Sequence, residues 1–328
     1  MKGVVVCPLR ALRVGILLTC ALSALLPPAP AWGAYPEKPV RLIVPSPPGG
    51  GNDIMARLAG QKLTEAWGKQ VLVDNRPGAG GAIAFEMAAR AEANGYTLLL
   101  GSTNFTVLPD MTKVNYDPIK DFAPVSLMAK SMNILLVHPS VPAKSAKELI
   151  ALAKANPGKL NYGTAIATSV HLAAELFKAS AGVNIVLVSY KGMGPALLDV
   201  IAGNVDVAFA NPAASHSYVQ SGRLRALAVT GERRSSMLPD VPTMAEAAIP
   251  GFEASTWWGI LVPTGTPAAI VAEVNTTLAR AFTQRELTER IAALGAEPVG
   301  GEPKRLADHL NSEIPKWRQV IRAANIRL

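Results

Sequence analysis

The sequence predicts an α/β protein with two lobes, each built on a mainly parallel sheet flanked by helices. Short apolar runs alternate with amphipathic stretches along the chain, a pattern typical of βαβ units. The length of 328 residues suits two domains of roughly 100 to 200 residues each. No long flexible linker separates two halves of the sequence. We therefore expect the chain to cross between the lobes on two extended segments, residues 131–138 and 255–262.

The first expected elements surround a glycine-rich turn. Strands are expected at residues 40–44, 70–74 and 96–101, because these are short apolar runs. Between the first two strands, apolar residues recur on one helical face, namely Met55, Leu58, Ala59, Leu63 and Ala66. This helix starts directly after the glycines, where Asn52 or Asp53 is available as its N-cap.

The alternation continues through the middle and the end of the chain. Ser145 and Glu148 predict a capping box, and the helix that they begin should end at residues 156–158. Further strands are expected at residues 160–163, 184–190, 205–209 and 224–230, with a short extended piece at 297–299. Further helices are expected at residues 169–181, 195–202, 267–282, 285–294 and 303–324.

The crossing segments divide the chain into a discontinuous first lobe and a continuous second lobe. We expect the first lobe to comprise residues 35–135 and 257–328, and the second to comprise residues 136–256. Two lobes joined by extended segments are the arrangement of receptors that close around a ligand by hinge bending.

The first 34 residues have the three parts of a secretory signal. Basic residues at positions 2, 10 and 13 precede an apolar run at 14–26, which is followed by prolines and by small residues at positions 31 and 33. The run is shorter than the ~20 residues that a membrane helix needs. We expect cleavage after Gly33 or Ala34 and export to a bacterial periplasm. A permanent membrane anchor, and a lipoprotein with its lipid on Cys20, are the alternatives.

The charge of the chain does not indicate a nucleic-acid-binding protein. The formal net charge is +8, but the basic residues are scattered and no run of five or more occurs. Aromatic residues make up only 5% of the chain, too few for a surface on which bases stack. Loss of residues 1–34 would leave 29 basic and 24 acidic residues and would remove both cysteines, Cys7 and Cys20. The mature chain would then have neither a disulfide nor a thiol nucleophile.

A loop with three consecutive glycines follows the first strand, in the stretch VPSPPGGGND at residues 44–53. Consecutive glycines let backbone N–H groups approach a ligand, and the helix start adds about half a positive charge, so an anion can bind there. A plain strand-to-helix turn is the alternative. The loop matches neither a Walker motif, which needs Lys-Ser or Lys-Thr, nor the glycine spacing of a dinucleotide-binding fingerprint.

Polar loops follow other predicted strands, at the ends where open α/β sheets bind ligands. These loops are residues 76–81, 102–104, 163–169 and 189–195. Turn formation and helix capping are the alternative explanations for each of them.

The sequence predicts no catalytic residues, no metal site and no cofactor. His171 and Glu175 share a helical face, but further zinc ligands and an HExxH motif are missing from the sequence. We expect His171 to be buried or to cap its helix. No Gly-x-Ser-x-Gly nucleophile motif occurs. Trp257 and Trp258 are expected in the hinge or the core rather than at a cofactor.

Seven stretches of the mature chain carry a resemblance to a known family. They are YPEKPVRLIVPSPPGGGNDIMAR, VDNRPGAGGAIA, YDPIKDFAPVSLMA, PGKLNYGT, VSYKGMGPALLDVIAGNVDVAF, GRLRALAVTGERRSSMLPDVPTMAEA and ALGAEPVGG. Together they make residues 35–328 resemble the Bug family, the periplasmic substrate-binding receptors of tripartite tricarboxylate transporters. The resemblance implies a two-lobed, periplasmic-binding-protein-like fold of type II with the ligand in the cleft between the lobes.

The resemblance also implies which loops form the site. Loops matching residues 47–53 and 190–192 close on a carboxylate, partly through bridging waters, and loops matching residues 102–104 and 164–169 complete the pocket. The predicted ligand-binding residues are Ser46, Pro47, Gly49, Gly50, Gly51, Asp53, Ser102, Thr103, Asn104, Thr164, Ala165, Thr168, Ser169, His171, Tyr190, Lys191, Gly192 and Asn211.

The chain departs from the family pattern at several positions in or next to the predicted site. The family commonly has Asp where this chain has Ala210, and glycines where it has Ala165 and Ala167. It often has Pro at the place of Ser189 and Phe at that of Ser46. A missing acidic group near the cleft would change the contacts to the far end of a ligand. The identity of the ligand therefore cannot be inferred from that of relatives.

Three functions follow from these observations. The first is a receptor that captures a small carboxylate, or a related small polar ligand, and delivers it to the membrane subunits of a tripartite tricarboxylate-type transporter. The second is a periplasmic enzyme acting on a small organic acid, with Asp53 or His171 as a general base. The third is a ligand sensor that presents its closed form to a signalling partner. We expect a monomer with no nucleic-acid partner.

Overall fold

The computed structural model describes residues 3, 35–165, 168–190 and 193–327. The predicted signal segment at residues 1–34, apart from Gly3, lies outside the described residues, as do Lys191 and Gly192 of the predicted site. The chain divides into two compact units, residues 1–37 and 38–328, and the second unit contains the elements below. Among the described residues, no helix has the length and apolar character needed to cross a bilayer.

The first sheet has six strands in the order β11-β4-β10-β3-β1-β2. Its strands are β1 (Val40–Val44), β2 (Val71–Asn75), β3 (Thr97–Ser102), β4 (Phe122–Met132), β10 (Ser255–Pro263) and β11 (Glu297–Pro298). β1 lies between β2 and β3 and runs parallel to both. β10 runs antiparallel to β3 and β4, and β11 runs antiparallel to β4.

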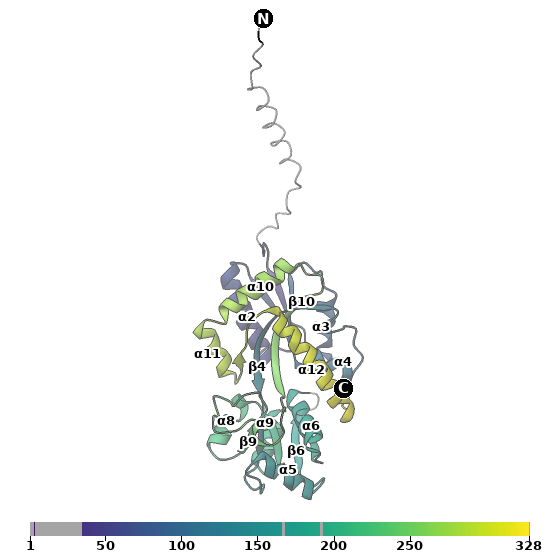
Figure 1. Cartoon of the computed structure of the whole chain (residues 1–328), viewed down its shortest axis with the longest axis vertical. Helices are drawn as coiled ribbons and strands as arrows, with labels where there is room; N and C mark the ends of the chain where they lie inside the picture. The colour runs from purple at the N-terminus through teal and green to yellow at the C-terminus, as the bar shows by residue number, and fades with distance from the viewer. Residues whose placement is uncertain (1–2, 4–34, 166–167, 191–192, 328) are drawn as a thin grey trace. The chain divides into compact units, whose positions relative to one another are not determined.

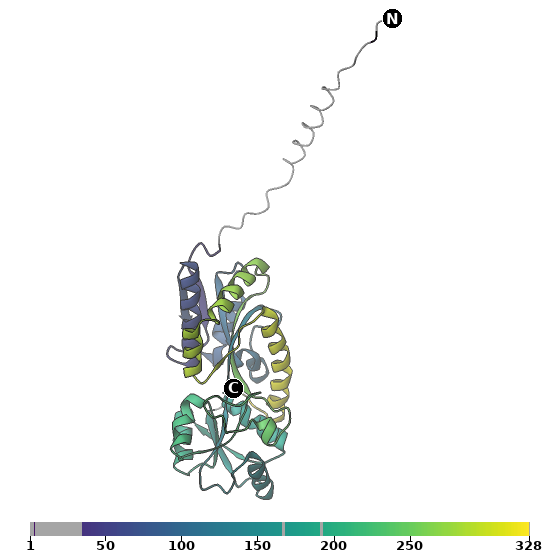
Figure 2. The ribbon, with the colours of Figure 1, turned by 60° about the vertical axis from the view of Figure 1, so that its left-hand side comes forward.

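Helices cover both faces of the first sheet (Figure 2). They are α2 (Gly51–Trp67), the short 3-10 helix η2 (Ala79–Gly81), α3 (Ala82–Ala89), α4 (Thr103–Met111), α10 (Ala268–Ala281), α11 (Arg285–Ala293) and α12 (Pro303–Ala323). Phe85 of α3, Phe105 of α4 and Leu306 of α12 pack around the buried Trp257 on one face. α2 and α10 pack together on the other side.

The second sheet has five strands in the order β7-β6-β8-β5-β9, in the lower part of Figure 1. Its strands are β5 (Ile134–Val137), β6 (Asn161–Ala165), β7 (Val186–Tyr190), β8 (Val207–Ala210) and β9 (Arg225–Val229). The helices around it are α5 (Ala146–Ala155), α6 (Ser169–Ala181), α7 (Met193–Ile201), α8 (Pro212–Gln220) and α9 (Met244–Ala247). Leu135 and Val137 pack into one core cluster while Ile134 and Leu136 pack into another, as expected for a strand buried on both faces.

Of the two predicted crossing segments, residues 131–138 join the sheets, whereas residues 255–262 lie within β10 of the first sheet, just after the chain has returned to it. β4 continues through the single residue Asn133 into β5, and the chain returns from β9 into β10. Asn133, the residue after β9 and the residue before β10 meet at a buried point. There Asn133 N–H donates to Thr230 Oγ1 at 2.8 Å, and Thr230 Oγ1 donates to the carbonyl of Ala254 at 2.6 Å. A hinge at this point is consistent with a fold in which the chain passes between two sheets on extended segments.

Both sheets are mixed, whereas the sequence predicts mainly parallel sheets. Three of the five pairings in the first sheet and two of the four in the second are antiparallel. The reason is that the crossing strands β10 and β5 insert between strands of the βαβ units and run against them. The α/β fold of two sheets flanked by helices is otherwise confirmed.

The last helix packs against β4 of the first sheet and against α6, which flanks the second sheet. Leu306 and Leu310 of α12 belong to the core of the first sheet, whereas Trp317, Val320 and Ile321 belong to a core cluster of the second. The predicted assignment of all of residues 257–328 to the first lobe does not anticipate this packing. α12 therefore ties the two parts of the fold together in addition to the crossing strands.

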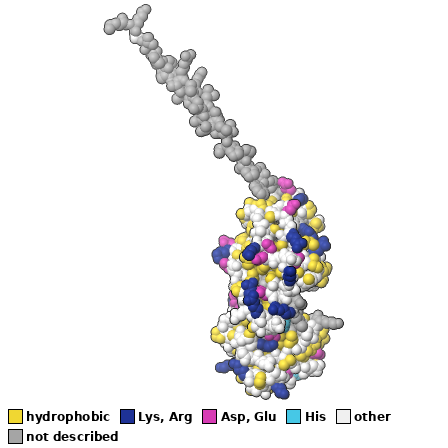
Figure 3. Space-filling model, turned by 90° about the vertical axis from the view of Figure 1, so that its right-hand side faces the viewer, with side chains coloured by type: hydrophobic (Ala, Val, Ile, Leu, Met, Phe, Trp, Pro, Cys, Tyr) yellow, Lys and Arg dark blue, Asp and Glu magenta, His cyan; other side chains and the backbone are white. Residues whose placement is uncertain are grey.

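Acidic and basic side chains are interspersed on the face drawn in Figure 3, with uncharged surface between them. Several opposite charges pair across short helical spacings, as in Lys304 with Asp308 at 2.6 Å.

Candidate functional site

A cavity of about 320 Å³ lies where loops of the first sheet meet helices of the second. Its lining residues are Ser46, Gly50, Gly51, Asn52, Ser131, Asn133, Thr168, Ser169, Val170, Met193, Asn211, Thr256 and Trp258. We call this space the helix-terminus cavity. None of these described lining residues has a charged side chain, so its polarity comes from hydroxyl, amide and backbone groups.

Four of the described helices begin at this cavity. α2 starts at Gly51 with Gly50 as its N-cap, and α6 starts at Ser169 with Thr168 as its N-cap. α7 starts at Met193, and Asn211 is the N-cap of α8. Each helix start leaves backbone N–H groups without partners inside the helix and carries about half a positive charge. The cavity is therefore suited to an anion without any cationic side chain among its described lining residues.

The helix starts differ in how their N–H groups are used. Thr168 Oγ1 accepts the N–H of His171 at 3.3 Å, and Asn211 Oδ1 accepts the N–H of Ala214 at 3.0 Å. Gly50, in contrast, has no side chain and makes no capping hydrogen bond. Among the three starts whose cap residues are described, the first N–H groups of α2 are thus the ones most available to a ligand.

Asp53 fixes the shape of the glycine loop. Its carboxylate accepts hydrogen bonds from the N–H of Gly49 at 2.9 Å, from Arg57 Nε at 2.9 Å and from Asn75 Nδ2 at 3.0 Å. Gly49 has φ of +87°, a left-handed conformation that favours glycine. Burial raises the pKa of Asp53, but the hydrogen bonds from Arg57, Gly49 and Asn75 outweigh it and the pKa lies below its ordinary value. Asp53 is therefore ionised and holds the loop in place.

Polar contacts join the walls of the cavity. Trp258 Nε1 donates to Asn52 Oδ1 at 2.8 Å, and Thr256 Oγ1 on β10 donates to Ser169 Oγ at the start of α6 at 2.8 Å. The buried Ser46 hydroxyl has no hydrogen-bond partner among the described residues. A buried hydroxyl without a partner is costly, so Ser46 is well placed to donate to a ligand oxygen.

The structure brings six of the predicted site residues to the cavity wall, namely Ser46, Gly50, Gly51, Thr168, Ser169 and Asn211. The other described candidates are not among its lining residues; they are Pro47, Gly49, Asp53, Ser102, Thr103, Asn104, Thr164, Ala165, His171 and Tyr190. Direct ligand contact by any of the candidates stays a prediction.

Several of these other candidates have identifiable contacts elsewhere. Tyr190 donates its hydroxyl to Asp199 Oδ2 at 2.6 Å, and this hydrogen bond raises the pKa of Tyr190 to about 12. Asn104 Nδ2 donates to the carbonyl of Gly80 at 3.2 Å. His171 is 3% exposed, and burial lowers its pKa below the ordinary value. The expectation that His171 is buried is thus confirmed.

Seven lining residues were not predicted, namely Asn52, Ser131, Asn133, Val170, Met193, Thr256 and Trp258. Four of them lie on the crossing strands or at their junction. Polar residues on a predicted crossing segment could have indicated these lining residues, because such a segment runs along the floor of any cleft between two lobes. Trp257, the neighbour of Trp258, is fully buried in the core as expected.

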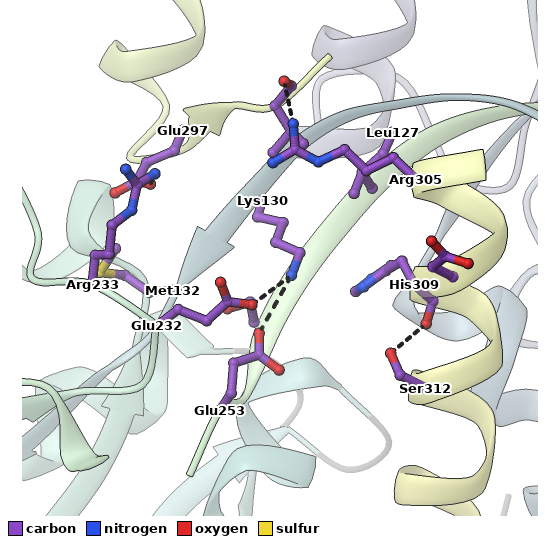
Figure 4. Close-up of a pocket in the computed structure, with 14 residues that line it drawn as sticks. Leu127, Lys130, Met132, Glu232, Arg233, Glu253, Glu297, Arg305, His309 and Ser312 are labelled. Carbon is purple, nitrogen blue, oxygen red and sulfur yellow. Dashed lines mark hydrogen bonds and ion pairs between the residues drawn. The ribbon is translucent and has the colours of Figure 1, made fainter. Parts of the chain in front are cut away.

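A second cavity, of about 350 Å³, lies on the opposite face of the β4/β10 pair (Figure 4). Successive side chains of a strand alternate between faces. Ser131 and its partner Thr256 face the helix-terminus cavity, whereas Lys130 and its neighbour Met132 line the second cavity.

The second cavity is lined by charged side chains of both signs, several of which form ion pairs with one another. Lys130 Nζ lies 3.3 Å from Glu232, and Arg233 lies 3.1 Å from Glu297. His309 projects from α12 and is 8% exposed, and burial lowers its pKa to about 3. Because of these ion pairs, the second cavity is less suited to binding an anion than the helix-terminus cavity is. No group of three or more histidine, cysteine or acidic residues that could hold a metal occurs in the described part of the chain.

A family model described as tripartite tricarboxylate transporter family receptor matches residues 55–326. The chain belongs to this receptor family. Protein BugT of Bordetella pertussis is 37% identical to the receptor over 298 residues, covering 90% of this chain and 91% of BugT. The resemblance to Bug proteins, predicted from the sequence, is thereby confirmed.

Solved structures agree with this family. The receptor is 38% identical to an R. palustris protein solved with adipate, with a TM-score of 0.74 and coverage of 89% of this chain and 99% of that one. It is 30% identical to MatC from Rhodopseudomonas palustris, solved with bound malate, with a TM-score of 0.72 and coverage of 88% and 100%. The fold is therefore that of solute-binding receptors.

Proposed function

We propose that this receptor captures a small carboxylate in the periplasm and delivers it to a tripartite tricarboxylate-type transporter. The observation that carries the proposal is the convergence of four helix starts on a cavity whose described lining residues are uncharged. Backbone N–H groups, the Ser46 hydroxyl and ordered water stabilise the carboxylate there. The adipate and malate in the two related structures support a carboxylate as the ligand class.

The arrangement favours binding over catalysis. An enzyme acting on an organic acid needs a general acid or base within hydrogen-bond reach of its substrate. The two residues considered for that role, Asp53 and His171, are not among the lining residues of the cavity. Asp53 is engaged with Gly49, Arg57 and Asn75.

A thermal-shift screen combined with mass spectrometry tests this function. The panel contains small mono- and dicarboxylates, amino acids and their amides. An acid present at a hundred times its dissociation constant stabilises the folded state by about 2.7 kcal/mol and raises the melting temperature. The same acid should be recovered unchanged after incubation with the receptor. Steady turnover of the acid, or stabilisation by amides alone, would contradict the proposal.

A further inference from the structure

An uncharged pocket adjoins the helix-terminus cavity. It has a volume of about 270 Å³ and is lined by Val170, Met193, Gly194, Leu197, Leu198, Ala210, Asn211, Ala214 and Tyr218. We call this pocket the apolar annex. Val170, Met193 and Asn211 line both spaces, so the annex and the cavity share a wall.

The annex forms because of how β8, α7 and α8 pack. Ala210 at the end of β8 lies on the same face of the second sheet as Leu197 of α7, and both belong to one core cluster. Tyr218 of α8 is a partly buried neighbour of that cluster. Ala210 is the residue through which β8 contributes to the annex. Because its side chain is only a methyl group, the edge of the core is left unfilled.

The described annex residues include no Asp, Glu, Lys, Arg or His. The side-chain oxygen of Asn211 is used as the cap of α8, where it accepts the N–H of Ala214. Leu198 on α7 is 57% exposed, so a leucine faces solvent at a pocket with apolar walls. Apolar surface of this kind is stabilised when an apolar group covers it.

We propose that the ligand is a carboxylate whose far end is uncharged and apolar, with that end in the annex. This inference rests on the proposed function, since it takes the carboxylate to lie at the helix starts. A second carboxylate placed in the annex would lose its hydration without meeting a charged partner among the described lining residues. Each methylene group buried there instead tightens binding roughly fourfold.

Hexanoate and adipate form a matched pair for the first test, because they have the same carbon chain and differ only in a methyl or a carboxylate at the far end. Isothermal titration of the mature receptor should show hexanoate binding at least about tenfold more tightly than adipate. If adipate binds as tightly as hexanoate, the proposal that an apolar end of the ligand lies in the annex is wrong, while the proposed function still stands. If neither of these acids nor any other carboxylate in the screen binds, the proposed function falls and this inference falls with it.

Two alanines at the start of α8 provide matched variants. Ala214 lines the annex and Ala213 does not, and both are exposed. An aspartate in the first turn of a helix interacts favourably with its dipole, so both variants should keep the melting temperature of the wild type. Ala214→Asp should weaken hexanoate binding at least about tenfold, whereas Ala213→Asp should change it by less than about twofold. Equal effects of the two variants would overturn the proposal.

Discussion

At the scale of single residues, Gly50 keeps open the space that a ligand needs. A Cβ added there meets no described atom within 4 Å, and Gly50 has φ of −85° and ψ of 171°, which a β-branched residue adopts easily. We expect Gly50→Val to leave the melting temperature unchanged and to weaken carboxylate binding at least about tenfold, because its bulk blocks approach to the start of α2. Isothermal titration and a thermal melt measure the two effects.

Lys191→Ala is the comparison for that variant. Lys191 is the one cation in the loops predicted to hold the ligand, and it lies outside the described residues. We expect its removal to weaken binding by about 1 kcal/mol or less. If Lys191→Ala abolishes binding while Gly50→Val preserves it, a side-chain charge holds the ligand and the helix starts do not.

His309 should make the stability of the receptor fall in mild acid. Burial lowers the pKa of His309 to about 3, below its ordinary value of 6.5. The unfolded chain therefore takes up a proton below pH 6.5 that the folded chain refuses. The stability from His309 is fully present above pH 6.5 and is lost toward pH 3, by up to about 1.4 kcal/mol per pH unit.

Urea unfolding between pH 7 and pH 4 checks this. His309→Gln should show a shallower loss of stability than the wild type. His138→Gln is the control, because it makes the same chemical change at a histidine that is only partly buried. The same slope in all three proteins would contradict the assignment.

Sequence alone predicts the type of the site residues better than their roles. Ser46 and Asn211 were predicted as site residues and lie at the cavity. The polar groups of Asp53 and Tyr190 were predicted in the same way, but the fold engages them with partners such as Asn75 and Asp199. Asp53 lies on α2 and Asn75 lies at the end of β2, so no local spacing in the sequence predicts this contact. The role of a side chain whose partners are distant in the sequence is determined by the tertiary fold, and local sequence patterns do not predict it.

At the scale of secondary-structure elements, a helix start at the cavity should contribute to carboxylate binding as long as its cap keeps its first turn ordered. Asn211 caps α8 at the cavity, and Ser145 caps α5, which does not line it. We expect Asn211→Ala and Ser145→Ala each to lower the free energy of unfolding by about 1 kcal/mol. Carboxylate affinity should fall only in Asn211→Ala.

Denaturant unfolding and isothermal titration of the pair separate the two effects. Ser145→Ala is matched in kind, since each substitution removes a side-chain cap of one helix. A fall in affinity of the same size in both variants would mean that general loosening of the fold, and not the start of α8, determines binding.

Strong periodicity made most elements predictable. The strand at Val40–Val44 and the helix at Ser169–Ala181 have the predicted bounds. At the predicted capping box, Ser145 accepts the N–H of Glu148, but the Glu148 carboxylate accepts the N–H of Lys144 rather than that of Ser145. The helix at Thr103–Met111 was not predicted, because it contains Pro109 and its first residues resemble a polar loop.

At the scale of the whole molecule, we expect the two lobes to close when the ligand binds. The helix-terminus cavity takes residues from both sheets, so a closed form makes ligand contacts that an open form lacks. Small-angle scattering should show a smaller radius of gyration at saturating ligand. An unchanged radius across a binding transition would count against closure.

We also expect the receptor to be a monomer in solution. A dimer observed by light scattering would contradict that expectation.

The crossing of the chain between the sheets was predictable, but its consequence for strand direction was not. Apolar runs at 131–138 and 255–262 indicate extended segments. Their insertion against the βαβ strands depends on where each segment enters the other sheet, and local patterns do not encode that. The packing of α12 against α6, which places Trp317 in a core cluster with residues of the second sheet, is likewise a long-range contact.

We expect the helix starts to hold a carboxylate by its negative charge. Isothermal titration of the receptor with each acid of the panel, and with the primary amide of the same acid, tests this most directly. The two compounds have nearly the same shape, so charge is the main difference between them. We predict that at least one acid binds and that its amide binds at least about tenfold more weakly. Amides that bind as tightly as their acids, or a panel in which no acid binds, would contradict the account.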